Sequence, residues 1–223
     1  MQKTIVSVCY DGSAPGLLVK HAKTLDSVGL RATFFADPPS VLAGLATWRN
    51  VHAAGHEIGN GTLLASALPD GSLPAFSREV VLDEIREAQR MLAEVFGREA
   101  RCVALPHGAD RCADGSYWAQ VGEIEEFVRI GVSGVNRLPI KKANELKSMI
   151  CDRLDSRAMI ERLVAEAGKS SWVLMVFTLR LSHEATHTEF LKHLADHSED
   201  YSVETVVRAA TASHRPSPQA HLS

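Results

Sequence analysis

Short apolar runs alternate with amphipathic segments along most of this 223-residue chain. The first run, residues 5–9, is rich in β-branched side chains, which is typical of a buried strand. Apolar residues then recur at helical spacing until Gly29, a natural helix stop, and a second short strand is predicted at residues 32–35. Strands that alternate with helices of about ten to fifteen residues predict a mainly parallel sheet covered by helices, and over this length they favour an α/β barrel.

Later segments continue the alternation of strands and helices, although residues 110–150 show neither a helical nor a strand-like spacing of apolar residues clearly. The remaining predicted elements are a helix over residues 41–51, a helix from its N-cap Ser77 to Gly97, a strand at 101–105, a helix capped by Ser156, a strand at 172–177 and a last long helix around 190–194. The length suits one domain, which we place at residues 1–212. Residues 213–223 have nothing to bury and are predicted to be a disordered tail.

The composition narrows the choice of partner and compartment. Lys and Arg number 24 against 27 Asp and Glu, and no basic stripe is interleaved with aromatic residues, so we expect no nucleic-acid partner. No signal-peptide pattern opens the sequence and no segment approaches a membrane span, so we expect a cytoplasmic protein without membrane contact. The four cysteines are dispersed without CxxC spacing, which predicts reduced thiols.

Four short motifs carry the strongest chemical signal: VCYDGS at residues 8–13, ATFF at 32–35, GHEIGNGTLLA at 55–65 and ALPHG at 104–108. In order and spacing they resemble the TFDDGP, ATFF, GHEIGNH(S/T)xxH and RxPxG motifs of the polysaccharide deacetylases, the NodB-homology group of carbohydrate esterases. The resemblance covers roughly residues 5–207. It implies an α/β fold of one type, the distorted (β/α)7 barrel.

The resemblance also implies a site chemistry that this chain does not reproduce. Family members are implied to hold a divalent metal with one Asp and two His, and to use a second Asp as base for a water whose pKa the metal lowers toward ~7. Asp11 takes the position of the metal-binding Asp, but Tyr10 takes that of the base, and an unperturbed tyrosine is only ~0.1% ionised at pH 7. Gly61 and Ala65 take the positions of the two histidines and carry no donor atoms.

Two further positions depart from the family pattern. Ala104 stands where the family has an arginine that orients the base, and the position of a histidine near the last barrel strand falls on Phe177 or Thr178, depending on register. Neither Phe nor Thr is a general acid. The usual mechanism is therefore not expected.

Two other metal sites can be drawn from the sequence. His56 and His107 could join Asp11 at the barrel mouth as a rebuilt zinc site, although backbone hydrogen bonding in a tight loop for His56 and an exposed turn for His107 are favoured. Residues 183–187, HEATH, match the zinc-protease pattern HExxH, but a polar loop entering the last helix near Thr186 is favoured. Cys9 shares the side-chain parity of Asp11 on the first strand and is interpreted as a packing residue.

The leading hypothesis is a deacetylase-like protein of carbohydrate metabolism that binds a saccharide or another small molecule without hydrolysing it and needs no cofactor. Its ligand pocket is predicted to be lined by Tyr10, Asp11, His56, Asn60, Thr62 and His107. The alternative is an active hydrolase on N-acetyl or ester bonds with a rebuilt zinc centre. A third reading, a scaffold for a protein partner, stays open without an interface signal in the sequence.

Overall fold

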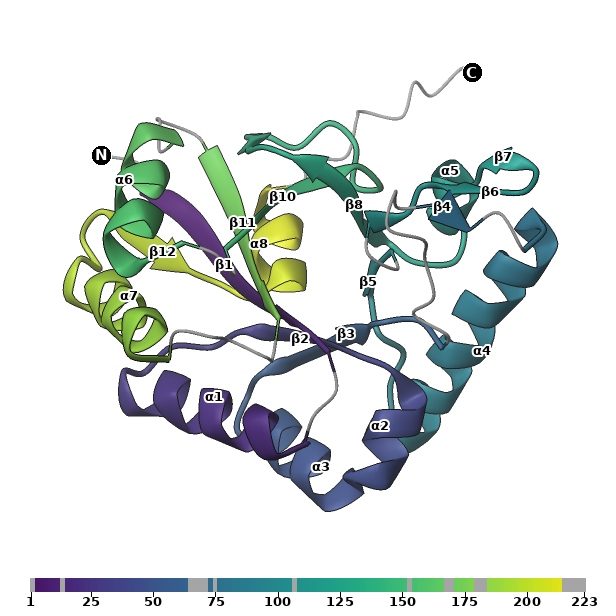
Figure 1. Cartoon of the computed structure of the whole chain (residues 1–223), viewed down its shortest axis with the longest axis horizontal. Helices are drawn as coiled ribbons and strands as arrows, with labels where there is room; N and C mark the ends of the chain where they lie inside the picture. The colour runs from purple at the N-terminus through teal and green to yellow at the C-terminus, as the bar shows by residue number, and fades with distance from the viewer. Residues whose placement is uncertain are drawn as a thin grey trace, which may run out of the picture.

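Seven parallel strands form a closed barrel in the part of the chain that the structure describes (Figure 1). The structure is a computed structural model and describes residues 3–12, 15–63, 72–73, 76–105, 108–151, 154–166, 171–178 and 184–213. β11 pairs back with β1 and closes the ring, which confirms the predicted distorted (β/α)7 barrel. In ring order the barrel strands are β1 (Thr4–Asp11), β2 (Thr33–Ala36), β3 (Glu57–Asn60), β5 (Cys102–Ala104), β8 (Phe127–Ser133), β10 (Leu146–Ile150) and β11 (Ser171–Thr178).

Helices follow most of the strands and cover the outside of the barrel (Figure 1). Within the described residues, no helix is long and apolar enough to cross a membrane. The helices are α1 (Pro15–Ser27), α2 (Pro38–Ala43), α3 (Leu45–Ala53), α4 (Arg78–Phe96), α5 (Trp118–Val121), α6 (Ser156–Glu166), α7 (Glu184–Asp196) and α8 (Val206–Ser213).

The helix ends follow the capping chemistry of the sequence, with two differences. α4 begins after its predicted N-cap Ser77 and ends at left-handed Gly97. The single helix predicted over residues 41–51 is wrong, because Gly44 separates α2 from α3. The N-cap of α6 is Asp155 rather than Ser156, since the Asp155 carboxylate accepts from the Ala158 amide at 2.7 Å.

Residues 110–150, which showed no clear period, form short elements around two barrel strands, β8 and β10. The helix around residues 190–194 is α7, but it is not the last element, because β12 and α8 follow it. Of the predicted tail, Ser213 ends α8 and residues 214–223 lie outside the described residues. The remaining strands are β4 (Ser72–Leu73), β6 (Arg111–Cys112), β7 (Gly115–Ser116), β9 (Asn136–Arg137) and β12 (Tyr201–Val203).

Side chains of the barrel strands alternate between two apolar layers. On β1, Val8 and Tyr10 face the outer layer between strands and helices, whereas Cys9 faces the barrel interior. α8 closes the interior at the amino end, where the Thr33 hydroxyl accepts from the first amide of α8 at 2.9 Å and donates to Glu57 at 2.6 Å. The opposite, carboxyl end of the strands is left as the mouth of the barrel.

Candidate functional site

An ion pair between Asp11 and Arg129 lies at the barrel mouth. Asp11 ends β1, and its Oδ2 accepts from Nη2 of Arg129, on β8, at 2.6 Å. The guanidinium carbon also lies 4.8 Å from the centroid of the Phe35 ring. The Arg129 side chain is 7% exposed and that of Asp11 is 36% exposed, so the carboxylate forms the open side of the pair. The planar guanidinium suits both contacts, which a lysine would not reproduce.

The second oxygen of Asp11 is an unused acceptor among the residues that the structure describes. Asp11 Oδ1 is buried and makes no hydrogen bond there. A buried acceptor without a donor costs about 1–3 kcal/mol. Thr178 lies directly beside Asp11 in the β1–β11 register, and Ile150, the last residue of β10, is 70% exposed. The mouth is therefore lined by the partly exposed carboxylate of Asp11, by Thr178 and by the apolar side chain of Ile150.

Gly61 follows β3 at the same end of the barrel, with its backbone pressed against β2. Its amide donates to the Ala36 carbonyl at 2.9 Å. A Cβ added at Gly61 would lie 2.8 to 2.9 Å from backbone atoms of Ala36, which is closer than real Cβ atoms approach. Backbone atoms cannot swing aside as a flexible side chain can, so any side chain at this position, histidine included, would require β3 and β2 to move apart.

Asn60 and Thr62 hold the turn after β3 from inside the protein, and both are fully buried. Asn60 Nδ2 donates to the Ile85 carbonyl at 3.1 Å and to Glu125 Oε1 at 3.0 Å, while Asn60 Oδ1 accepts from the Thr62 amide at 2.8 Å. Thr62 adopts a positive φ of 65°. The prediction that these two side chains line a pocket needs correction, because neither presents surface to a ligand.

Glu125, the acid that Asn60 contacts, is buried with 1% of its surface exposed. Burial raises its pKa to about 8, and the Asn60 hydrogen bond opposes this only in part. An unfolded glutamate titrates near pH ~4.3, so between that pH and about 8 the folded protein keeps a proton that the unfolded chain has released. The folded state binds more protons in this window, and its stability therefore falls as the pH rises through it.

We expect Glu125→Gln to remove this decline. Between pH 5 and pH 8 the melting temperature of the wild type should fall more than that of the variant, which should be the more stable at pH 8 by at least ~1 kcal/mol, or ~2–4 °C. Exposed Glu123→Gln is the matched control and should follow the wild type. Circular dichroism measures the melting temperature at each pH. If the melting temperatures of Glu125→Gln and the wild type changed with pH in parallel, the raised pKa would not belong to Glu125.

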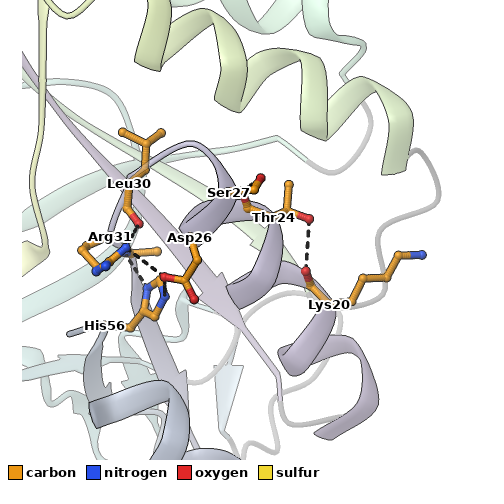
Figure 2. A network of polar contacts seen from close by, with 8 residues as sticks. Lys20, Thr24, Asp26, Ser27, Leu30, Arg31 and His56 are labelled. Atoms are coloured by element: carbon orange, nitrogen blue, oxygen red, sulfur yellow. Dashed lines mark hydrogen bonds and ion pairs between the residues drawn. The ribbon is translucent and has the colours of Figure 1, made fainter. Parts of the chain in front are cut away.

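His56 lies at the other end of the barrel, because it precedes β3 whereas Asp11 ends β1. Its Nδ1 accepts from the Ala32 amide at 3.2 Å, and its Nε2 lies 3.4 Å from Asp26, which also pairs with Arg31 at 2.9 Å (Figure 2). Burial lowers its pKa, and nearby Asp26 opposes this in part. This geometry agrees with the interpretation that His56 bonds to the backbone. His56 is too far from Asp11 to share a zinc ion with it, so the zinc site predicted from Asp11, His56 and His107 is wrong in its use of His56.

Tyr10 points away from the mouth, into the layer between β1 and the helices. It is fully buried and stacks on Phe34, with ring centroids 4.8 Å apart and planes at 14°. Its hydroxyl lies 2.6 Å from Nε2 of His187 on α7. The predicted stacking of Tyr10 on a sugar ring therefore needs correction: strand parity places it on the opposite face from Asp11.

The other residues considered as metal ligands in the sequence either lie outside the described residues or do not form a metal site within them. His107, Ala65 and His183 lie outside the described ranges. α7 begins at Glu184 of the HExxH pattern, earlier than Thr186. Cys9 is buried, which raises the pKa of its thiol, and it packs in the barrel interior. Among the described residues no three His, Cys, Asp or Glu side chains gather as a metal site.

The amino-terminal half of the chain matches a known protein family. Residues 1–122 match the family described as polysaccharide deacetylase. The chain belongs to the polysaccharide deacetylase family. No curated protein matches it.

Solved structures of the family share this fold at low sequence identity. A family 4 acetyl xylan esterase from Clostridium thermocellum superposes with a TM-score of 0.66 at 13% identity, over 94% of this chain and 91% of that one. The peptidoglycan deacetylase PdaC from Bacillus subtilis gives 0.59 at 20% identity, over 93% and 89%. A CE4 family pseudoenzyme from Bacillus anthracis gives 0.62 at 17%, over 92% and 65%, and a mutant of it with restored enzymatic activity gives 0.63 at 16%, over 92% and 67%.

The register settles where the divergent family positions lie. Thr178 pairs with Asp11, so Thr178 is at the mouth, whereas Phe177 pairs with Tyr10 and packs in the outer layer. Ala104 pairs with Arg129 on the neighbouring strand. Arg129 therefore lies one strand further round the ring from Ala104, but it contacts Asp11, at the metal-binding position, and not Tyr10, at the position of the base.

Proposed function

We propose that this deacetylase-like protein lacks the metal-dependent activity of its family and binds a saccharide at the barrel mouth. The observation that carries the proposal is the ion pair of Asp11 with Arg129, in which a guanidinium contacts the carboxylate that the family motif reserves for the metal. A fixed positive charge 2.6 Å from that carboxylate opposes a second cation there.

The residues present do not fit a divalent metal. A catalytic zinc takes three protein ligands, and Asp11 is the one retained from the family set of one Asp and two His. Gly61 has neither a donor atom nor room for one, and Ala65 has no donor atom. Tyr10, in the place of the base, is buried on the outer layer, and burial raises its pKa well above the usual value. No hydrolytic step follows from such a set.

Saccharide binding requires much less of the site. Sugar hydroxyls need acceptors and donors, while the C–H faces of the ring need an apolar surface. The Asp11 side chain is 36% exposed and presents a carboxylate acceptor, and exposed Ile150 supplies apolar surface at the same end of the barrel. The proposed ligand contacts are therefore Asp11, Thr178 and Ile150, with Arg129 fixing the carboxylate.

Calorimetric titration with a chitooligosaccharide tests the binding half of the proposal. We expect saturable binding with a Kd of about 1 mM or tighter, roughly −4 kcal/mol, and no acetate released with or without added zinc. Asp11→Asn should weaken binding by about tenfold, because a hydrogen bond to a charged acceptor is worth ~1.5–3 kcal/mol. Exposed Glu126→Gln should leave binding unchanged. Absence of saturable binding by the folded protein would overturn this half.

Elemental analysis of protein purified without chelator tests the other half. We expect zinc, nickel and cobalt far below one atom per chain. Stoichiometric metal together with chelator-sensitive acetate release would establish the alternative, an active hydrolase with a rebuilt centre. Asp11→Asn should then abolish that release.

A further inference from the structure

Two histidines lie side by side at the carboxyl end of α7. The ring centroids of His193 and His197 are 4.0 Å apart, with the planes at 32°. His197 directly follows α7, and its amide donates to the His193 carbonyl at 3.1 Å, so the pair keeps the spacing of one helical turn. The His197 carbonyl accepts from the amide of Tyr201, which pairs with Thr4 at the start of β1. The two histidines are therefore at the amino end of the barrel, opposite the mouth.

A hydrogen bond fixes which nitrogen of His197 can bind a ligand. His197 Nδ1 lies 2.9 Å from the His193 carbonyl oxygen, which can only accept, so Nδ1 carries the ring proton. The neutral ring then keeps its lone pair on Nε2. Metal-binding histidines commonly have this arrangement, because their other ring nitrogen donates to a carbonyl or a carboxylate.

His193 offers a second imidazole nitrogen. Its Nε2 is covered and makes no hydrogen bond among the described residues. Burial and the neighbouring His197 lower the pKa of His193, and Asp196 and Asp200 oppose this in part. The ring is therefore neutral at pH 7, which is the form of imidazole that coordinates a metal.

The surroundings of the pair favour a cation. The carboxyl end of a helix stabilises positive charge, and the exposed carboxylates of Asp196 and Asp200 are close enough to act on His193. In the described part of the chain, no third His, Cys, Asp or Glu joins the pair as a further ligand. Two imidazoles are therefore the protein ligands, and water would take the other positions around an ion.

We propose that His193 and His197 bind one divalent transition-metal ion, with Cu²⁺ held most tightly, through one nitrogen of each ring. Imidazole suits Cu²⁺, and a site of nitrogen and oxygen donors binds Cu²⁺ more tightly than Ni²⁺ or Zn²⁺. Two imidazoles that share an ion at ~2.0 Å place their ring centroids roughly 4.5–5 Å apart, so the pair needs to open by only about 0.5–1 Å. The ion would enter between the rings, where Nε2 of His193 lacks a partner.

Calorimetric titration of the folded full chain with Cu²⁺ tests the site. We expect one ion per chain with a Kd on the order of 10 µM, weak enough for the ion to be lost during purification. His193→Gln and His197→Gln should each weaken binding at least about tenfold, since even groups outside the ligand set are worth ~10–100-fold in metal affinity. His214→Gln, which removes a histidine after α8, should leave binding unchanged. Asp11→Asn should also leave it unchanged, which separates this site from the proposed saccharide site.

Electron paramagnetic resonance of the copper complex gives a second readout. We expect hyperfine lines from two imidazole nitrogens in the wild type, and loss of the complex as the pH falls below ~6, where histidine binds protons instead. Absence of saturable Cu²⁺ binding would overturn the proposal. So would equal binding by His193→Gln, His197→Gln and the wild type, or a two-nitrogen signal that persists in either variant, because the ion would then lie elsewhere.

Discussion

Replacing Gly61 with alanine should lower the free energy of unfolding by about 1–3 kcal/mol, which is a fall in melting temperature of ~2–4 °C per kcal/mol for a chain of this size. The added Cβ would lie 2.8 Å from the carbonyl carbon of Ala36 and 2.9 Å from its nitrogen and oxygen. Relief requires β3 to separate from β2, at the place where the Gly61 amide bonds to Ala36. Denaturant and thermal unfolding measure the loss.

Gly16→Ala is the matched control. A Cβ at Gly16 meets nothing within 4 Å, and the residue lies in α1, so alanine should be neutral or stabilising by ~0.5–1 kcal/mol. A Gly61→Ala variant as stable as the wild type would show that the backbone has room at this position.

The same contact predicts the outcome of rebuilding the family motif. Gly61→His combined with Ala65→His restores the letters of the metal motif, but it should bind no stoichiometric zinc and should melt at a lower temperature than the wild type. The Bacillus anthracis pseudoenzyme has a mutant with restored enzymatic activity. Here the obstacle is the backbone at Gly61 and the guanidinium beside Asp11, not the absence of imidazoles alone. Tight zinc binding by the double variant would refute this account.

Periodicity and capping residues predicted the barrel, because each is a local property of the chain. α4 between Ser77 and Gly97 shows this, with a cap at each end and one apolar stripe between. The break between α2 and α3 at Gly44 was not predicted, because the helical spacing of apolar residues continues across it. β8 was missed because its carboxyl half is exposed and Arg129 interrupts its apolar half.

The candidate site was predicted less well, because it depends on which end and which face of a strand a residue occupies. His56 was placed at the mouth, although a residue before a parallel strand lies at the amino end. Tyr10 was placed beside Asp11, although neighbours on a strand face opposite layers. Arg129 could have been suspected from its sequence context, a charge within the apolar run of residues 127–130. Its partner Asp11 lies 118 residues away and could not be inferred from that run.

Removing either member of the Asp11–Arg129 pair should destabilise the protein by about 1–3 kcal/mol, with the larger loss for Arg129→Gln. That variant leaves the Asp11 carboxylate, whose Oδ1 is buried, without its cation and removes the contact of Arg129 with Phe35. Asp11→Asn replaces the charged acceptor of the Arg129 guanidinium with a neutral amide oxygen. Because Asp11 is 36% exposed, water screens part of the attraction, and the coupling energy from the double-mutant cycle should be about 1–2 kcal/mol rather than the full cost of a buried pair.

An exposed pair of an arginine and a carboxylate supplies the control. Arg101 lies 2.7 Å from Glu126 and above the ring of Phe127, with both charged side chains about half exposed at 48% and 49%. The cycle through Arg101→Gln and Glu126→Gln should give a coupling of ~0.2–1 kcal/mol that falls with added salt. The coupling at Asp11 and Arg129 should exceed it and should resist salt, because the guanidinium there is shielded from solvent. Equal couplings in the two cycles would mean that Arg129 does not fix the carboxylate, and the argument against a metal beside Asp11 would then rest on Gly61 and Ala65 alone.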